Sequence, residues 1–125
     1  MLDNINLPLL LKIINKRIEK LLDKDHQIGH SYLMTVQNID DLKLVFHNKI
    51  IPLLQEYFFG DYGKIGLVLG EGFFEKIDTD NDKKIFAKFD DYDADEFAEK
   101  PIYKLWNTVK MSAEDFTKAI NLLMQ

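Results

Sequence analysis

Apolar side chains recur every three or four positions near the start of the chain, the spacing of one face of an α-helix. The stripe predicts an amphipathic helix over residues 7–23, with lysines and a glutamate on the opposite, solvent-facing side. Asn6 suits the N-cap position, and Pro8 suits the first turn, where no backbone donor is needed. The residues of this stripe are Leu7, Leu10, Leu11, Ile14, Ile18, Leu21 and Leu22.

The middle of the chain carries a second apolar stripe with helical spacing. We expect this helix to begin at Asn38 or Asp40 and to end at Gly60, because glycine suits a helix C-terminus. Pro52 lies inside the stripe, lacks a backbone donor and clashes with the preceding turn, so we expect a kink or a break there. A short helix over residues 62–69 follows and is expected to end at the next glycine.

The pattern changes in the last third of the chain. Residues 78–100 are rich in Asp and Glu and are expected to be mostly solvated, although residues 84–89 alternate as a strand does. Residues 102–109 alternate in the same way, and we expect them to pair with 84–89. Ser112, with Asp115 three residues later, predicts the start of a final helix. The apolar face of that helix comprises Phe116, Ala119, Ile120, Leu123 and Met124.

These elements predict a mainly α fold in two parts. Residues 1–70 form a helical unit, and residues 71–125 form a small α+β extension packed beside it. Hydrophobic residues make up 46% of the 125-residue chain, which is enough for a core.

Charge and composition exclude several classes of function. The net charge is −5, and a single arginine, Arg17, accompanies fifteen lysines, so we expect no direct DNA binding by this segment. The chain has no cysteine, and therefore neither disulfides nor thiolate metal sites. Its apolar runs are too short to span a membrane, and its start does not resemble a signal peptide. We expect a cytoplasmic protein.

Residues 24–31 form a polar elbow between the first two predicted helices. Gly29 permits backbone angles that other residues resist and is expected to relax the turn, and a glycine surrounded by hydrogen-bonding side chains suits close approach to a ligand. We therefore select Gln27, Gly29, His30 and Ser31 as candidate ligand-facing residues. Two alternatives stay open: the elbow has no ligand role, or His30 ties the two helices together through a buried hydrogen bond.

His26 and His30 have the spacing that places two imidazoles on one side of a helix, and Asp23 and Asp25 lie nearby, as in a zinc site. Gly29 argues against a continuous helix, however, and no glutamate follows His26 as in the metalloprotease motif. We expect no metal site.

Two other fragments resemble ligand-binding motifs and fail their requirements. Residues 78–82 resemble the start of a calcium loop, which needs a glycine and a glutamate where this chain has Lys83 and Phe89. Residues 63–64 resemble part of a phosphate loop, but the earlier glycine and the following Ser or Thr are missing. Neither serine has the surroundings of a nucleophile. We expect no catalytic residue in this chain.

Several strings along residues 5–70 resemble the C-terminal part of McrB-like AAA+ proteins. These are the GTP- or ATP-hydrolysing motor subunits of 5-methylcytosine-specific restriction systems. The order and spacing of two separate motifs hold over some 45 residues. The similar strings are residues 15–19, 22–26, 28–32 (Ile-Gly-His-Ser-Tyr), 52–54 (Pro-Leu-Leu) and 56–59 (Glu-Tyr-Phe-Phe), with Asp61.

This resemblance implies that the chain is an AAA+ lid-type helical subdomain. In the family, an upstream large subdomain holds the phosphate loop, the Mg²⁺ motif and the arginine finger, and the subunits form rings that work with a nuclease subunit. The resemblance implies no cofactor for the chain alone, and GTP or ATP with Mg²⁺ in the full motor. Whether the chain is an excised fragment or a truncated gene product stays open, as does the choice between GTP and ATP.

The resemblance also implies that Gln27, Gly29, His30 and Ser31 face the nucleotide. Gln27 stands where some relatives carry an arginine that senses phosphate, and Arg17, two turns back on the first helix, is the candidate substitute. The expected function is nucleotide sensing and subunit contact, without hydrolysis by the chain alone. The rival interpretation is a free-standing protein-interaction or adaptor module.

Overall fold

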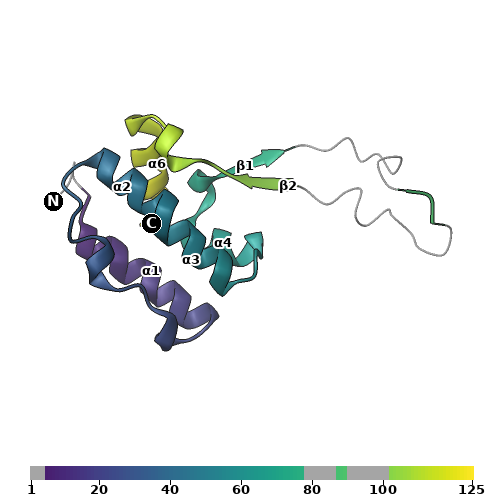
Figure 1. Cartoon of the computed structure of the whole chain (residues 1–125), viewed down its shortest axis with the longest axis horizontal. Helices are drawn as coiled ribbons and strands as arrows, with labels where there is room; N and C mark the ends of the chain where they lie inside the picture. Colours follow the sequence, from purple (N-terminus) through teal and green to yellow (C-terminus); the bar gives the residue numbers. More distant parts are fainter. Residues whose placement is uncertain (1–4, 78–86, 90–101) are drawn as a thin grey trace.

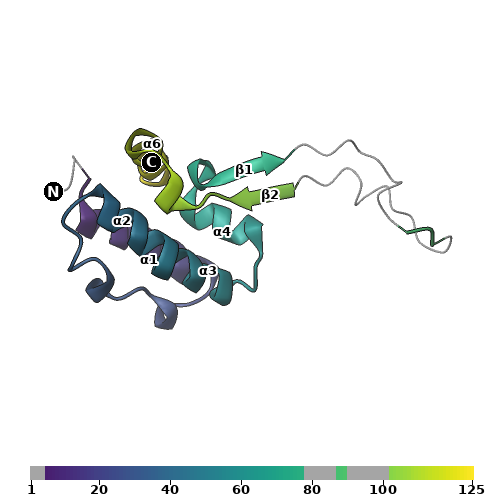
Figure 2. The ribbon, with the colours of Figure 1, turned by 45° about the horizontal axis from the view of Figure 1, so that its top comes forward.

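The computed structural model describes residues 5–77, 87–89 and 102–125 of the chain. Most of the regular structure in these ranges is helical, and the predicted mainly α fold is confirmed (Figure 1). A two-stranded antiparallel sheet extends away from the helices (Figures 1 and 2). The α-helices are α1 (Leu7–Leu21), α2 (Ile39–Val45), α3 (Ile51–Tyr57), α4 (Tyr62–Leu69) and α6 (Ala113–Leu123), and the strands are β1 (Phe74–Ile77) and β2 (Ile102–Leu105).

The first helix follows the prediction closely. The side chain of Asn6 accepts a hydrogen bond from the N–H of Leu9 at 3.1 Å, and Pro8 lies in the first turn, as expected. Leu10, Leu11, Ile14 and Ile18 of the predicted stripe are buried. The helix ends at Leu21 and not at residue 23, so the stripe does not continue and Leu22 is 41% exposed.

The second predicted helix is present, but its irregular segment lies before Pro52. The side chain of Asn38 caps α2 by accepting from the N–H of Asp41 at 2.8 Å. The backbone then widens into a π-helical segment, η3 (Phe46–Ile50), and continues as α3 with helical angles. Proline offers no N–H to the preceding turn and crowds its carbonyl. The wider π spacing therefore takes the place of the predicted kink or break.

Two residues after α3 adopt left-handed backbone angles, with φ of 52° at Phe59 and 74° at Gly60. The N–H of Gly60 donates to the carbonyl of Gln55 at 2.9 Å, which satisfies a free carbonyl at the end of the helix. The predicted stop at Gly60 is thus confirmed. Phe59 is an unexpected feature, because bulky side chains rarely adopt this conformation.

The α+β region contains a different strand pair from the one we predicted. β2 pairs with β1, with Phe74 opposite Leu105 and Ile77 opposite Ile102. Residues 87–89 have no regular structure, and the rest of the predicted strand 84–89 and of the calcium-loop fragment 78–82 lie outside the described residues. The observed pairing with β1 was missed, because this four-residue strand follows a glycine-rich turn and shows too short an alternation to be recognised.

One buried cluster joins the helical part to the segment after residue 70. Three aromatic rings form its centre: Phe46 stacks on Phe73 with ring centres 5.2 Å apart, and Phe116 meets both edge to face. The predicted capping of α6 is confirmed, since the hydroxyl of Ser112 accepts from the N–H of Asp115 at 3.0 Å. The division into parts 1–70 and 71–125 stays a prediction, although both parts contribute to one core.

A buried polar connection reinforces this junction. The Nζ of Lys43 donates to the carbonyl of Met111 at 2.6 Å, and the hydroxyl of Thr108 donates to the carbonyl of Lys43 at 2.7 Å. Both side chains are buried and both have partners, so they link α2 to the turn before α6 without leaving a polar group unsatisfied.

Candidate functional site

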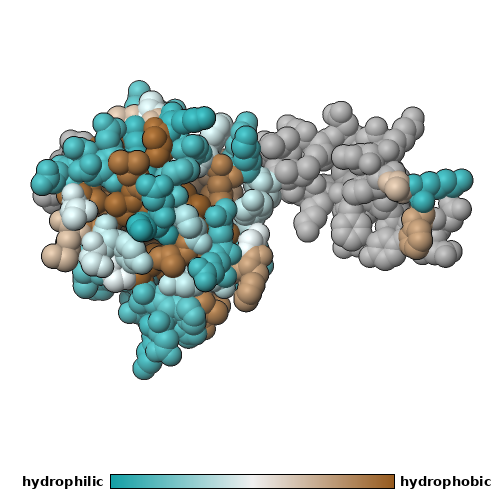
Figure 3. All heavy atoms as spheres, in the orientation of Figure 1, coloured by the Kyte–Doolittle hydropathy of each residue, from teal (hydrophilic) through white to brown (hydrophobic). Residues whose placement is uncertain are grey.

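The polar elbow between α1 and α2 consists of two short 3₁₀ turns, η1 (Lys24–His26) and η2 (His30–Tyr32). The carboxylate of Asp23 caps the first turn by accepting from the N–H groups of Asp25 and His26 at 2.9 and 3.0 Å. The elbow lies at one end of the helical body (Figure 1), and hydrophilic side chains cover that end in the space-filling view (Figure 3).

Asn15 holds the elbow in place. The amide oxygen of Asn15 accepts from the N–H of Ile28 at 2.6 Å, and its amide nitrogen donates to the carbonyl of the same residue at 3.0 Å. The side chain of Ile28 is buried in the core, 3% exposed. One polar clamp and one apolar anchor therefore fix the centre of the elbow against α1.

All four candidate residues are exposed around this fixed point. Gln27 precedes Ile28, and Gly29, His30 and Ser31 follow it, so the structure brings the four together on one short segment. Because His30 is exposed, it does not form the buried tether between the two helices that was the alternative to a ligand role; a different residue, Asn15, ties the elbow to α1. Sequence reasoning missed Asn15, which looks like an ordinary polar residue on a helix.

Gly29 does not use the conformational freedom that drew attention to it. Its φ is −74°, which any residue adopts, and an added Cβ would meet only the hydroxyl of Ser31, at 3.9 Å. The expectation that the glycine relaxes the turn was therefore wrong. What Gly29 offers is an exposed backbone without a side chain, open to a ligand that approaches closely.

His26 and His30 lie on separate turns rather than on one helix. The Nδ1 of His26 is 2.6 Å from the Asp23 carboxylate, and its ring meets Tyr57 edge to face at 5.0 Å. The hydrogen bond from His26 lowers the pKa of Asp23, and burial raises the pKa of the Tyr57 hydroxyl. Within the described ranges, no group of three or more His, Asp or Glu side chains is arranged to hold a metal ion.

Residues 6–66 match the family model described as McrB, alpha-helical lid domain. The chain carries a McrB alpha-helical lid domain. A comparison with curated proteins found no match. The match to the family model confirms the predicted resemblance, and the predicted span, residues 5–70, agrees with the matched segment. In the described part of the chain, no helix is long and apolar enough to cross a membrane.

The McrB lid contains the clamp and all four candidate residues of the elbow. It also contains Arg17, whose guanidinium donates to the carbonyl of Val68 at 2.8 Å and to that of Gln125 at 3.2 Å. The bond to Val68 places the guanidinium at the C-terminus of α4, where a positive charge interacts favourably with the negative end of the helix dipole. Arg17 therefore ties the lid to residues that follow it, and the possibility that it replaces the arginine absent at Gln27 loses its support.

Two lysines of the McrB lid line a hollow that borders the elbow. A shallow hollow of about 540 Å³ on α1 is lined by Lys16, Arg17, Glu19 and Lys20. Gln27 adjoins it, because its Nε2 lies 3.5 Å from a carboxylate oxygen of Glu19. The signal in the sequence is the i, i+4 pair of lysines on the solvent side of the first helix, next to the elbow.

Proposed function

We propose that the McrB lid of this chain senses nucleotide through its elbow, as part of a ring-forming AAA+ motor of a restriction system. Gln27, His30 and Ser31 hydrogen-bond the nucleotide, and Gly29 lets the nucleotide come close to the backbone. An upstream large subdomain holds the phosphates of GTP or ATP and the Mg²⁺ ion. The lid closes over the nucleotide and contacts the neighbouring subunit.

The observation that carries this proposal is an elbow, inside a McrB lid, whose backbone is fixed and whose candidate residues are exposed to solvent. Its side chains are exposed and polar, whereas its backbone is fixed by Asn15 and Ile28. A fixed backbone lowers the entropy cost of ordering the contacting groups when a ligand binds. The arrangement therefore suits recognition better than it suits packing.

Charge neutralisation at the phosphates is the task of other groups. Arg17 is occupied by the carbonyls of Val68 and Gln125, and an amide such as Gln27 forms hydrogen bonds but carries no charge. Lys16 and Lys20 line the same hollow as Glu19, the residue that Gln27 approaches, and are cations that this lid offers near the elbow. We therefore assign to the elbow the recognition of the nucleotide, and to the large subdomain the neutralisation of its charge.

The chain alone hydrolyses no nucleotide in this proposal. Phosphoryl transfer depends on a phosphate cradle and a bound Mg²⁺ that position and neutralise the reacting groups. The nuclease subunit and the neighbouring motor subunits are the proposed partners, and DNA is contacted by other parts of the assembly. Turnover of GTP or ATP by the purified chain, lost on mutation of a residue of this chain, would overturn the proposal.

A protein-interaction module is the second candidate function. Phe59 favours it, because this ring is 96% exposed on a left-handed backbone, and Leu67 is 66% exposed. Large apolar side chains at such exposure are typical of interaction sites when they gather into a patch. An upstream reading frame that encodes a phosphate loop and an acidic Mg²⁺ motif favours the motor; its absence favours the module.

Two matched glutamine variants test the nucleotide-facing role. Gln27→Ala in the chain joined to its large subdomain is expected to weaken GTP or ATP binding by about threefold to tenfold, the loss of one hydrogen bond. Gln55→Ala, an exposed glutamine on α3, is the control and should leave the affinity unchanged. Equal affinities for the two variants, measured by calorimetry with each nucleotide, contradict the proposal.

A further inference from the structure

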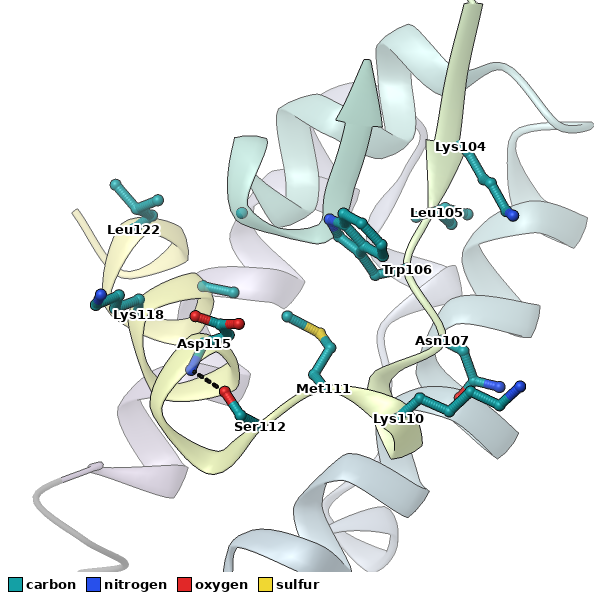
Figure 4. Close-up of a pocket in the computed structure, with 12 residues that line it drawn as sticks. Lys104, Leu105, Trp106, Asn107, Lys110, Met111, Ser112, Asp115, Lys118 and Leu122 are labelled. Atoms are coloured by element: carbon teal, nitrogen blue, oxygen red, sulfur yellow. Dashed lines mark hydrogen bonds between the residues drawn. The ribbon is translucent and has the colours of Figure 1, made fainter. Parts of the chain in front are cut away.

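We propose that a hollow between β2 and α6 binds the acidic segment 90–99 of a neighbouring copy of this chain. The proposal deepens the subunit-contact part of the proposed function and rests on it, because a ring supplies the neighbouring copy. The hollow has a volume of about 580 Å³ and is drawn in Figure 4. It lies after residue 66, outside the segment that matches the McrB lid.

The floor of the hollow is apolar and firmly built. Met111 points into its centre, between Trp106 on one side and α6 on the other (Figure 4). Gly72 and Ala119 touch beneath it, because a Cβ added to Gly72 would lie 2.6 Å from the Cα of Ala119. The ring of Trp106 remains 43% exposed, although such a side chain gains most when it is covered. The floor therefore suits an apolar or aromatic side chain.

Three lysines and one carboxylate lie around the hollow, and Figure 4 draws Lys104 and Lys110 extending away from its centre. Lys104, Lys110 and Lys118 are exposed lining residues, and Asp115 is the only carboxylate in the lining. Lys118 also pairs with Glu114 at 3.4 Å on the solvent side of α6. The first turn of α6 carries Glu114 and Asp115, which offset its positive dipole end, so the positive charge around the hollow comes from the lysines. A rim of separate lysines over an apolar floor is complementary to a peptide that combines carboxylates with an aromatic anchor.

The chain itself contains such a peptide. Six carboxylates and no lysine or arginine occur in residues 90–99 (Asp-Asp-Tyr-Asp-Ala-Asp-Glu-Phe-Ala-Glu). The negative charge of this segment is therefore larger than the net charge of the chain, which is −5. Tyr92 and Phe97 supply two aromatic anchors within the same ten residues. Opposite charges on the segment and the rim favour this pairing and speed its formation.

The direction of β1 and β2 favours the hollow of a neighbouring copy over the hollow of the same chain. β1 ends at Ile77 and β2 begins at its partner Ile102, so the intervening chain leaves and rejoins the sheet there. The hollow lies at the opposite end, beyond Leu105, and the strands lead away from the helices (Figures 1 and 2). Because Ile77 and Ile102 lie at the end of the sheet remote from the hollow, we assign the segment to the hollow of a neighbouring copy.

Trp106 is the only tryptophan of the chain, so its fluorescence reports directly on the hollow. The probe is a synthetic peptide of residues 90–99, titrated into the purified full chain. We expect a saturable blue shift of the Trp106 emission. A matched peptide with Asn and Gln in place of the six acids should bind about tenfold more weakly or worse, which corresponds to about 1.4 kcal/mol. No shift, or an equal shift with the amide peptide, overturns the proposal.

Charge-reversal variants locate the binding site. The triple variant Lys104→Glu, Lys110→Glu and Lys118→Glu should abolish the shift. A control triple variant at exposed lysines elsewhere, Lys12→Glu, Lys24→Glu and Lys49→Glu, carries the same change in net charge and should weaken binding far less. Equal losses in the two triple variants would indicate nonspecific attraction and contradict the assignment to this hollow.

A full-length variant with amides in place of the six acids distinguishes the neighbouring copy from the same chain. If the segment binds a neighbour, the Trp106 emission of wild type and variant coincides at low protein concentration and diverges as the concentration rises. A difference that persists at the lowest concentration places the segment in its own hollow and overturns the neighbouring-copy assignment. The experiment contains no nucleotide, so its failure is distinguishable from a failure of nucleotide sensing by the elbow.

Discussion

The aromatic junction of Phe46, Phe73 and Phe116 and the polar elbow are held by opposite means. At the junction three fully buried rings pack on one another, and their position follows from the exclusion of water. At the elbow a single apolar side chain, Ile28, is buried, and two hydrogen bonds from Asn15 fix the backbone. The comparison shows that the residues packed in the core and the exposed polar residues of the elbow are different residues in different parts of the chain.

This separation has a consequence for mutations. Changes at the junction should alter stability strongly, because a cavity in a well-packed core costs both burial and contacts. Changes to the exposed side chains of the elbow should leave stability nearly unaltered and should act on what the elbow contacts. Asn15 lies between these extremes, since it is structural but serves the elbow.

The largest expected effect is at the junction. Phe73→Ala should lower the free energy of unfolding by about 3–5 kcal/mol, because it empties the space between Phe46 and Phe116. Phe59→Ala is the matched control: its ring is 96% exposed, so the change should stay within about 0.5 kcal/mol. Urea unfolding of both variants checks the prediction, and similar losses in the two would contradict the shared core.

An intermediate effect is expected at the clamp. Asn15→Ala should cost about 1–3 kcal/mol, because it leaves the N–H and carbonyl of Ile28 without their partner. Asn121→Ala, an exposed asparagine on α6, makes the same chemical change in a helix and should be nearly neutral. Hydrogen exchange should also accelerate at residues 27–31 in the first variant alone; unchanged protection there would show that Asn15 does not hold the elbow.

The smallest effect depends on pH and arises at Asp23. The hydrogen bond from His26 lowers the pKa of this carboxyl below its value of 3.8 in the unfolded chain. A lowered pKa stabilises the fold above the unfolded value, and this stabilisation is lost as the pH falls through the folded value. Asp23→Asn keeps a capping oxygen but removes the charge. Its deficit in stability at neutral pH should therefore disappear in acid, and a deficit that is constant with pH would contradict a charged hydrogen bond between Asp23 and His26.

Hydrophobic spacing and capping residues allowed most of the helical fold to be predicted. The stripes of α1 and α6, the caps Asn6 and Asn38, and the stop at Gly60 each depend on local chemistry that the sequence displays. The strand pair was missed because pairing depends on partners far apart in the chain. Here β1 and β2 are separated by residues 78–101, and the alternation over 84–89, nearer in sequence to β2, drew the prediction away from β1.

The elbow was found from its composition, but the groups that position it were not. The side chain of Asn15 reaches Ile28, thirteen residues along the chain, and Arg17 reaches Val68 and Gln125. Such contacts depend on how the helices meet, which periodicity does not specify. The choice of Gly29 shows the reverse error, since its place in the elbow was predicted while its backbone angles are ordinary.

His30 gives the most direct test of the claim that the elbow serves nucleotide recognition and not the fold. His30→Ala should leave the free energy of unfolding of the isolated chain within about 0.5 kcal/mol of wild type. In the chain joined to its large subdomain, it should weaken nucleotide binding by about threefold to tenfold. His47→Ala, an exposed histidine on η3, should change neither quantity. A loss of about 1–3 kcal/mol in stability with unaltered nucleotide affinity would contradict the account.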